Sequence, residues 1–127
     1  MNPNTTLHKY LINLPAALLD YPFGDDIHVY KVEGKVFAIY FQDANSKRLN
    51  LKCAPVLAEQ LRMVFSEVTP GYHMNKKHWN TVDLTGNLPQ SEVFKQIDHS
   101  YALIVKKLPK VVKQRLRIQH EGLAWLS

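Results

Sequence analysis

Three consecutive runs of strand-forming residues, separated by short turn sequences, constrain the fold of this chain more than any other feature. Ile27–Val32 and Lys35–Phe41 are rich in β-branched and aromatic side chains, and only Glu33-Gly34 separates them. A second turn signal, at residues 43–46, precedes Arg48–Lys52, in which charged or polar residues alternate with leucine. Connections this short join antiparallel strands, so residues 27–52 predict a three-stranded antiparallel meander.

Three helical patterns accompany the meander. A threonine at position 5 or 6 can cap a first helix that ends at Pro15, Pro55 suits the first position of a second helix, and Pro89 precedes a third. Apolar side chains recur at helical spacing in all three, most regularly in the third. They are Leu7, Tyr10, Leu11 and Leu14; Leu57, Leu61, Val64 and Phe65; and Val93, Phe94, Ile97, Tyr101, Ile104, Val105 and Leu108. Residues 16–26 are predicted to be a connection whose apolar side chains pack on the core.

The stretch Pro70–Val82, with sequence PGYHMNKKHWNTV, is predicted to be a β-hairpin. With Lys76-Lys77 as a two-residue loop, strand alternation puts its side chains on two faces. The outer, polar face carries His73, Asn75, His78 and Asn80, and the apolar underside carries Tyr72, Met74, Trp79 and Thr81. The hairpin therefore predicts two further strands and a doubly cationic tip.

The predicted order of elements is α-β-β-β-α-β-β-α. This order is typical of an α+β domain, here a single two-layer sandwich of an antiparallel five-stranded sheet with helices on one face. At 127 residues the chain is long enough for one such domain with its own core. A basic segment after Pro109, residues 110–117, is expected to resume helically, and residues 122–127 to form a loose tail or an apolar flap.

The composition indicates the cellular compartment of the protein. No apolar run approaches the length of a membrane span, and the N-terminus lacks a basic region followed by an apolar core, so we expect neither a membrane segment nor a secretion signal. The single cysteine, Cys53, excludes an internal disulfide and suits a reducing cytoplasm. We expect a cytoplasmic monomer.

Charge is distributed unevenly along the chain. Residues 1–69 hold seven Lys and Arg against seven Asp and Glu, whereas residues 70–127 hold nine against four. The formal net charge of +5 therefore comes entirely from the second half. A one-sided basic balance favours a polyanionic partner.

The sequence resembles the MmcQ/YjbR family at six segments that occur in family order. They are Tyr21–Gly24, Lys35–Ala38, Asn50–Cys53, Pro70–Val82, Asp98–Tyr101 and Leu108–Lys110. The resemblance implies a compact fold similar to the frataxin-like and secretion-chaperone-like α/β sandwiches, and a DNA-binding role of the "double wing" type. It covers residues 5–113. We therefore expect residues 1–113 to be the family-like domain and residues 114–127 to be a C-terminal extension of the same unit.

The spacing of histidine, cysteine and acidic residues gives little support for a metal site or a catalytic site. Zinc needs three or four converging ligands, and His73, His78, Cys53 and His99 show no spacing that would bring them together. A cysteine nucleophile needs a nearby base or cation, but strand alternation points Cys53 and Lys52 to opposite faces. Asp25 and Asp26 are adjacent in a turn, which suits joint acid–base work poorly. We expect no metal, no cofactor and no enzymatic activity.

Nucleic-acid binding is the function that the sequence favours. Lys76 and Lys77 at the hairpin tip could contact phosphates, as could Lys106, Lys107, Lys110 and Lys113, which lie in a run without acidic residues. His73, Asn75, His78 and Asn80 could add hydrogen bonds beside the tip. The alternative is a protein-interaction or chaperone-like module that binds a peptide or partner at a sheet edge or helix groove. The two differ in salt dependence, which would be steep only for phosphate binding.

Overall fold

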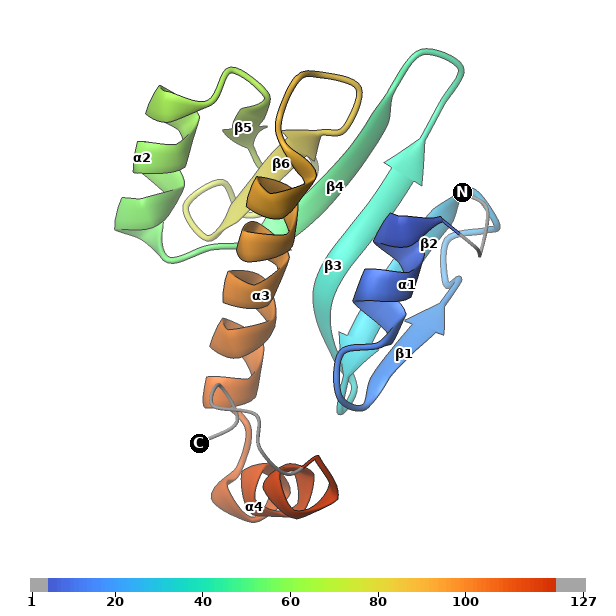
Figure 1. The fold of residues 1–127 in the computed structure, drawn as a ribbon, viewed down its shortest axis with the longest axis vertical. Helices are drawn as coiled ribbons and strands as arrows, with labels where there is room; N and C mark the ends of the chain where they lie inside the picture. The colour runs from blue at the N-terminus through green and yellow to red at the C-terminus, as the bar shows by residue number, and fades with distance from the viewer. Residues whose placement is uncertain (1–4, 121–127) are drawn as a thin grey trace.

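The computed structural model describes residues 5–120, which form one six-stranded antiparallel sheet and four helices (Figure 1). In chain order the elements are α1 (Thr6–Ile12), β1 (Ala17–Asp20), β2 (Ile27–Val32), β3 (Lys35–Gln42), β4 (Lys47–Lys52), α2 (Pro55–Val64), β5 (Val68–Pro70), β6 (Trp79–Asp83), α3 (Gln90–Lys106) and α4 (Lys110–Gln119). The strands lie in the order β1-β2-β3-β4-β6-β5, and each neighbouring pair is antiparallel. The predicted α+β class is confirmed.

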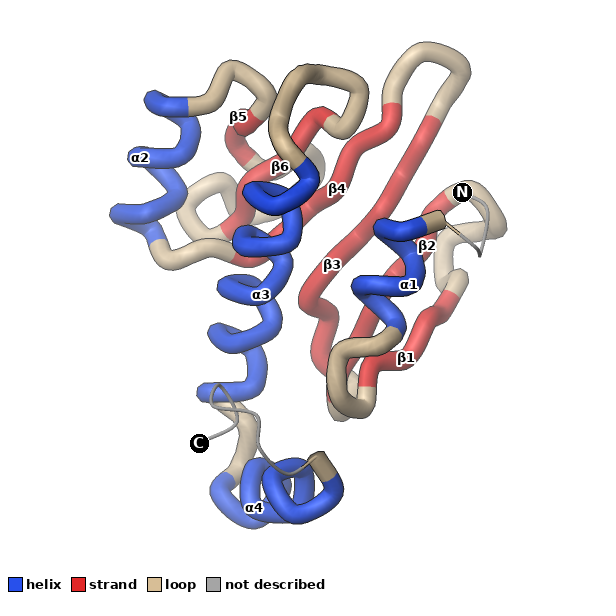
Figure 2. The backbone as a smooth tube through the Cα atoms, in the orientation of Figure 1, coloured by secondary structure: helices blue, strands red, loops and turns tan. Residues whose placement is uncertain are grey.

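Helices α1, α2 and α3 lie on one face of this sheet, and α4 lies beyond the C-terminal end of α3 (Figures 1 and 2). The core forms between the sheet and these helices. Phe37 of β3 and Tyr101 of α3 are both fully buried, and their rings meet edge to face with centroids 5.2 Å apart. Leu49 and Leu51 of β4 point to the same side and are also buried. Within the described residues, the opposite face of the sheet has no helix over it.

The sheet has six strands in the described residues, not the five predicted, because residues 17–20 form an edge strand. Leu18 of β1 pairs with Lys31 of β2, and Ala16 before it has a positive φ of 60°. A strand of four residues is too short for alternation to distinguish it from a connection. Leu19 packs against the core as predicted, but Leu18 and Phe23 do not, since each is 68% exposed.

The Pro70–Val82 hairpin is present, but its loop is longer than predicted. β5 ends at Pro70 and β6 begins at Trp79, so residues 71–78, called here the 71–78 loop, connect them. Thr69 pairs with Thr81 and Pro70 with Asn80, whereas a two-residue loop at Lys76-Lys77 would have placed His73 opposite Asn80. The Lys76-Lys77 pair offers no residue suited to the positive φ of a tight hairpin turn, and the chain closes two successive turns inside the longer loop instead.

The chain continues helically after Pro109, as expected. Leu116 of α4 is buried, and Arg115 forms an ion pair with Glu33 in the β2–β3 turn. Helix α4 therefore packs at the end of the sheet where β2 turns into β3. The predicted tail or flap of residues 122–127 lies outside the described residues. No helix among residues 5–120 combines the length and apolar character needed to cross a bilayer.

Candidate functional site

The 71–78 loop is held against α2 by Arg62. The Nε of Arg62 donates to Oδ1 of Asn80 at 2.7 Å, and its Nη2 donates to the backbone oxygens of Lys76 and Trp79. A charged donor makes stronger hydrogen bonds than a neutral one, so this contact fixes the loop firmly. The loop therefore lies against the domain and is not a projecting wing.

The two predicted tip lysines are both exposed but differ in their contacts. The Nζ of Lys76 donates to the backbone oxygen of Gly71 at 3.0 Å, which ties this amino group to its own loop. Lys77 forms only a backbone hydrogen bond, from its N–H to Oδ1 of Asn75 at 2.9 Å. Lys77 is thus the tip cation with an uncommitted amino group in the described residues, and Asn75 serves the turn.

The other predicted hairpin residues do not share one polar face. His73 is exposed with φ 59°, and its ring contacts that of Tyr72 with centroids 4.0 Å apart. His78 is half-buried, and its backbone oxygen accepts from Cys53 N–H at 2.8 Å. Asn80 is 1% exposed on the helix-covered face, where its Nδ2 donates to the backbone oxygen of Ala58. The predicted outer face is therefore wrong, because the longer loop changes the strand register.

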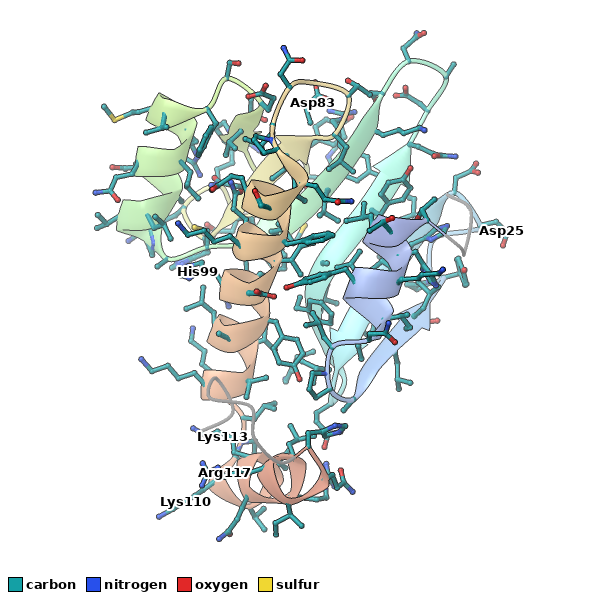
Figure 3. All side chains as sticks on the ribbon, viewed as in Figure 1. Asp25, Asp83, His99, Lys110, Lys113 and Arg117 are labelled. Carbon is teal, nitrogen blue, oxygen red and sulfur yellow. The ribbon has the colours of Figure 1, made fainter. Side chains whose placement is uncertain are left out.

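The predicted C-terminal lysines gather where α3 meets α4. Lys106 and Lys107 end α3, Lys110 begins α4, and the Nζ of Lys113 donates to the backbone oxygen of Lys106 at 2.8 Å. A hollow of about 470 Å³ lies at this junction, lined by Leu108, Lys110, Lys113, Gln114 and Arg117. Figure 3 shows the labelled cations of α4 together at one end of the molecule, with the carboxylates of Asp25 and Asp83 far from them.

Lys52 joins this cluster and is not among the residues predicted to bind nucleic acid. It is the last residue of β4 and pairs with Trp79, the residue that follows the 71–78 loop. Burial lowers the pKa of Lys52, and the neighbouring ammonium of Lys107 lowers that pKa further. Only the strand register brings Lys52 to this place, so no sequence motif could have indicated it. We call Lys52, Lys106, Lys107, Lys110 and Lys113 the basic corner.

The uncovered face of the sheet carries an apolar groove of about 690 Å³. Its lining consists of Pro22, Phe23, Ile27, Val29, Lys31, Val36, Ile39, Phe41, Asn50, Tyr72, His73 and Met74. No motif in the sequence indicates this groove, but the composition of β3 does. Residues 36–41 are apolar without alternation, so β3 is apolar on both faces, and helices cover only one of them.

Burial shifts the pKa of both the Cys53 thiol and the His99 imidazole. Cys53 is buried, and burial raises the pKa of its thiol to about 11. His99 is half-buried, its Nε2 accepts from the backbone N–H of Ala54 at 3.2 Å, and burial lowers its pKa. Among residues 5–120, no three His, Cys, Asp or Glu side chains converge in a way that could hold a metal ion.

Comparison with known proteins places this fold and these residues in a family. The family model described as YjbR matches residues 12–103. The uncharacterized protein YjbR of Escherichia coli K12 is 43% identical over 89 residues, covering 70% of this chain and 75% of that protein. The uncharacterized protein YbdF of Escherichia coli O157:H7 is 31% identical over 112 residues, covering 88% and 92%.

Solved structures agree. The crystal structure of the Deinococcus radiodurans protein DR2400, of domain family DUF419, superposes with a TM-score of 0.80 at 34% identity, covering 87% of this chain and 84% of that one. A crystal structure of a Pseudomonas syringae protein gives a TM-score of 0.69 at 27% identity, covering 81% and 98%. The sequence match and the shared fold together show that this chain belongs to the YjbR family.

Proposed function

We propose that this protein binds nucleic acid without sequence specificity, through phosphate contacts made by the basic corner. The observation that supports the proposal most is the approach of Lys52 to Lys107. Two ammonium groups repel each other at close range, and the ion pairs formed in residues 5–120, Lys31–Asp20 and Arg115–Glu33, leave both without a carboxylate partner. A phosphate oxygen between them would relieve that repulsion.

The basic corner also links the two segments on which the sequence-based prediction rested. Lys52 pairs with the residue that follows the 71–78 loop, and it neighbours Lys107 at the end of α3. Exposed Lys77 lies in that loop, and Lys110 opens α4. Cations therefore extend from the loop to α4, which is the arrangement that a strand of regularly spaced phosphates requires.

The contribution expected of each lysine follows from its contacts. Lys76 donates to its own loop, so its replacement should matter less than that of a corner lysine. Lys52, Lys107 and Lys110 donate no side-chain hydrogen bond to a carboxylate or carbonyl oxygen in the described residues, so they can turn toward a ligand. Binding should thus depend on the corner more than on the hairpin tip.

The test is fluorescence anisotropy of a labelled DNA duplex, titrated at several salt concentrations. Wild-type affinity should fall by about 0.9 log units per log unit of salt for each phosphate neutralised. Replacing Lys52, Lys107 and Lys110 with Gln should reduce that slope by roughly two to three, because three phosphate contacts are lost. The matched control replaces three exposed lysines outside the corner, Lys9, Lys35 and Lys47, and should reduce the slope by less than half as much.

Two results would contradict the proposal. Absence of binding at low salt would exclude phosphate contacts of useful strength, and equal effects of the two triple variants would show that only net charge matters. The alternative function, a module that binds a peptide or protein partner, predicts binding that changes little with salt, so the same titration separates the two classes.

A further inference from the structure

The apolar groove on the uncovered sheet face is a preformed cavity with an aliphatic floor. Ile27 and Val29 of β2 and Val36 and Ile39 of β3 form the floor, and its volume of about 690 Å³ is in the usual range for small-molecule sites. All twelve lining residues fall inside residues 12–103, the part matched by the family model. Four of the six segments that carry the family resemblance, Tyr21–Gly24, Lys35–Ala38, Asn50–Cys53 and Pro70–Val82, contribute to the lining.

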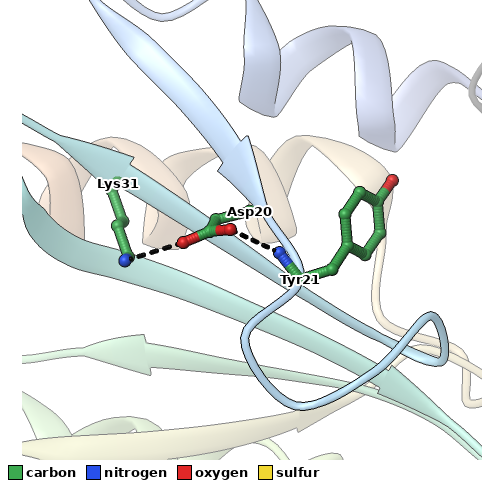
Figure 4. A network of polar contacts seen from close by, with 3 residues as sticks. All are labelled: Asp20, Tyr21 and Lys31. Carbon is green, nitrogen blue, oxygen red and sulfur yellow. Dashed lines mark hydrogen bonds and ion pairs between the residues drawn. The ribbon is translucent and has the colours of Figure 1, made fainter.

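One wall of the groove is the segment of residues 21–26, which contributes Pro22 and Phe23. Figure 4 shows how its beginning is fixed. The carboxylate of Asp20 accepts from the backbone N–H of Tyr21 at 2.8 Å and from Nζ of Lys31 at 3.0 Å. The same contact neutralises Lys31, the one charged side chain in the groove lining.

The opposite wall is the 71–78 loop, which contributes Tyr72, His73 and Met74. A short chain of hydrogen bonds fixes it to the sheet. The backbone N–H of Tyr72 donates to Oγ1 of Thr81 at 2.8 Å, and Nδ2 of Asn50 donates to the backbone oxygen of Tyr72 at 3.0 Å. Thr81 Oγ1 in turn donates to Oδ1 of Asn50 at 2.5 Å. Both walls are thus ordered before any ligand arrives, which lowers the entropy lost on binding.

Arg48 is not itself a lining residue, but its guanidinium lies over the rings of two residues that are, Phe41 and Tyr72. Its guanidinium carbon lies 4.9 Å from the ring centroid of Phe41 and 4.6 Å from that of Tyr72. Within the described residues the guanidinium forms no hydrogen bond and no ion pair, and its Nε is buried without a partner. Asp43 and Asp83 are the carboxylates nearby, and each accepts hydrogen bonds from its own turn.

We propose that the groove binds a small molecule with an apolar body and a carboxylate, the body on the aliphatic floor and the carboxylate against Arg48. The guanidinium is held between two rings, and its N–H groups have no hydrogen-bond acceptor. It can therefore bind a planar anion through two parallel hydrogen bonds. No carboxylate side chain lines the groove to repel such a group. The positive charge of Arg48 and the apolar lining of the groove therefore both favour an amphipathic acid.

Two other kinds of occupant fit less well. An extended peptide gains much of its affinity from backbone hydrogen bonds, but the floor residues Ile27, Val29 and Ile39 already pair with their neighbouring strands. Nucleobases need polar partners for their edges, and the aliphatic floor supplies none. This site is also distinct from the basic corner, and neither proposal depends on the other.

The test uses 8-anilinonaphthalene-1-sulfonate, an apolar anion whose fluorescence rises on binding, and competes it with ten-carbon ligands that differ only in their head group. Decanoate should displace the dye at a concentration roughly tenfold below that needed for decanol, because only decanoate can pair with Arg48. Decyltrimethylammonium should compete least. Replacing Arg48 with Met should bring decanoate to the level of decanol and leave decanol unchanged.

A second variant tests the apolar part of the site and does not depend on Arg48. Phe23→Ser removes a wall side chain that is 68% exposed, so it should fold normally and weaken both decanoate and decanol by roughly fivefold. The matched control is Ile118→Ser on α4, where a 77% exposed side chain does not line the groove and displacement should not change.

The proposal is overturned if decanoate and decanol compete equally in the wild-type protein, or if Phe23→Ser and Ile118→Ser behave alike. Displacement of the dye by a short single-stranded oligonucleotide, but not by decanoate, would assign the groove to nucleic acid instead. Displacement by an apolar uncharged peptide alone would assign it to protein partners. Loss of duplex binding by the corner variant, with normal dye displacement, would show that the two sites are separate.

Discussion

Replacing Ser100 with Ala should destabilise this protein far more than its small size suggests. Ser100 lies on α3 and is completely buried. Its hydroxyl donates to the backbone oxygen of Phe37 at 2.6 Å and accepts from the backbone N–H of Lys52 at 2.9 Å. The last direct pair between β3 and β4 is Ala38 with Leu51, so the hydroxyl bridges the position at which the ladder ends. A β-bulge opposite Tyr30 and Lys31 also leaves Phe37 without a pair in β2.

The size of the effect follows from these two contacts. Alanine would leave one backbone donor and one backbone acceptor without a partner, and each such buried group costs about 1–3 kcal/mol. We expect a total loss of about 2–4 kcal/mol in the free energy of unfolding, since Lys52 is only partly buried. A domain of this size has about 5–15 kcal/mol to lose, so the variant should fold but melt well below the wild type.

Urea denaturation followed by circular dichroism measures the loss, with the m-value checked for a constant unfolding transition. Ser91→Ala is the matched control, because Ser91 is an exposed serine near the start of the same helix and should change stability by less than about 0.5 kcal/mol. Hydrogen exchange of the Lys52 amide should accelerate in Ser100→Ala alone. A loss below about 1 kcal/mol with normal protection of that amide would refute the reasoning, because the strands would then have closed to pair directly.

Much of the fold follows from local sequence signals. The side chain of Thr5 accepts from the N–H of His8 and caps α1 as predicted, Pro55 opens α2, and the apolar stripe of residues 93–105 becomes the buried face of α3. Each of these features depends on residues within a few positions of one another. The sequence therefore predicts them without knowledge of the tertiary structure.

The hairpin loop could not be predicted in the same way. Its conformation depends on Arg62, which lies 14 residues before Lys76 and reaches the loop only after α2 has packed beside β6. Arg48 is a similar case. Its alternation with leucine in β4 predicts a strand correctly, but only the register with Phe41 places its guanidinium beside the groove. The candidate sites were thus missed or misplaced where they depend on contacts between distant segments.

Three further predictions concern single side chains. Cys53 should react slowly with a thiol reagent at neutral pH in the native state, because burial raises its pKa to about 11, and it should react rapidly once urea unfolds the chain. Gly71→Ala should destabilise the protein by about 1–3 kcal/mol in urea denaturation, because a Cβ would lie 2.8 Å from Cβ of Trp79 and 2.9 Å from its backbone oxygen. Stability should also fall as the pH drops below 6.5, in part because of His99.

The sign of the His99 effect follows from its hydrogen bond. Burial lowers the pKa of His99 below its ordinary 6.5, and its neutral Nε2 accepts from Ala54 N–H at the start of α2. Below pH 6.5 the unfolded chain takes up a proton that the folded chain resists, so stability is lost progressively until the pH passes the folded pKa. His28 is buried and its pKa is lowered as well, so it acts in the same direction. His99→Gln keeps an acceptor for Ala54 but cannot titrate, and it should flatten, without abolishing, the decline in melting temperature between pH 7 and about pH 5. An unchanged decline in that variant would mean that His28 or the carboxylates, not the contact between His99 and α2, set the acid sensitivity of the fold.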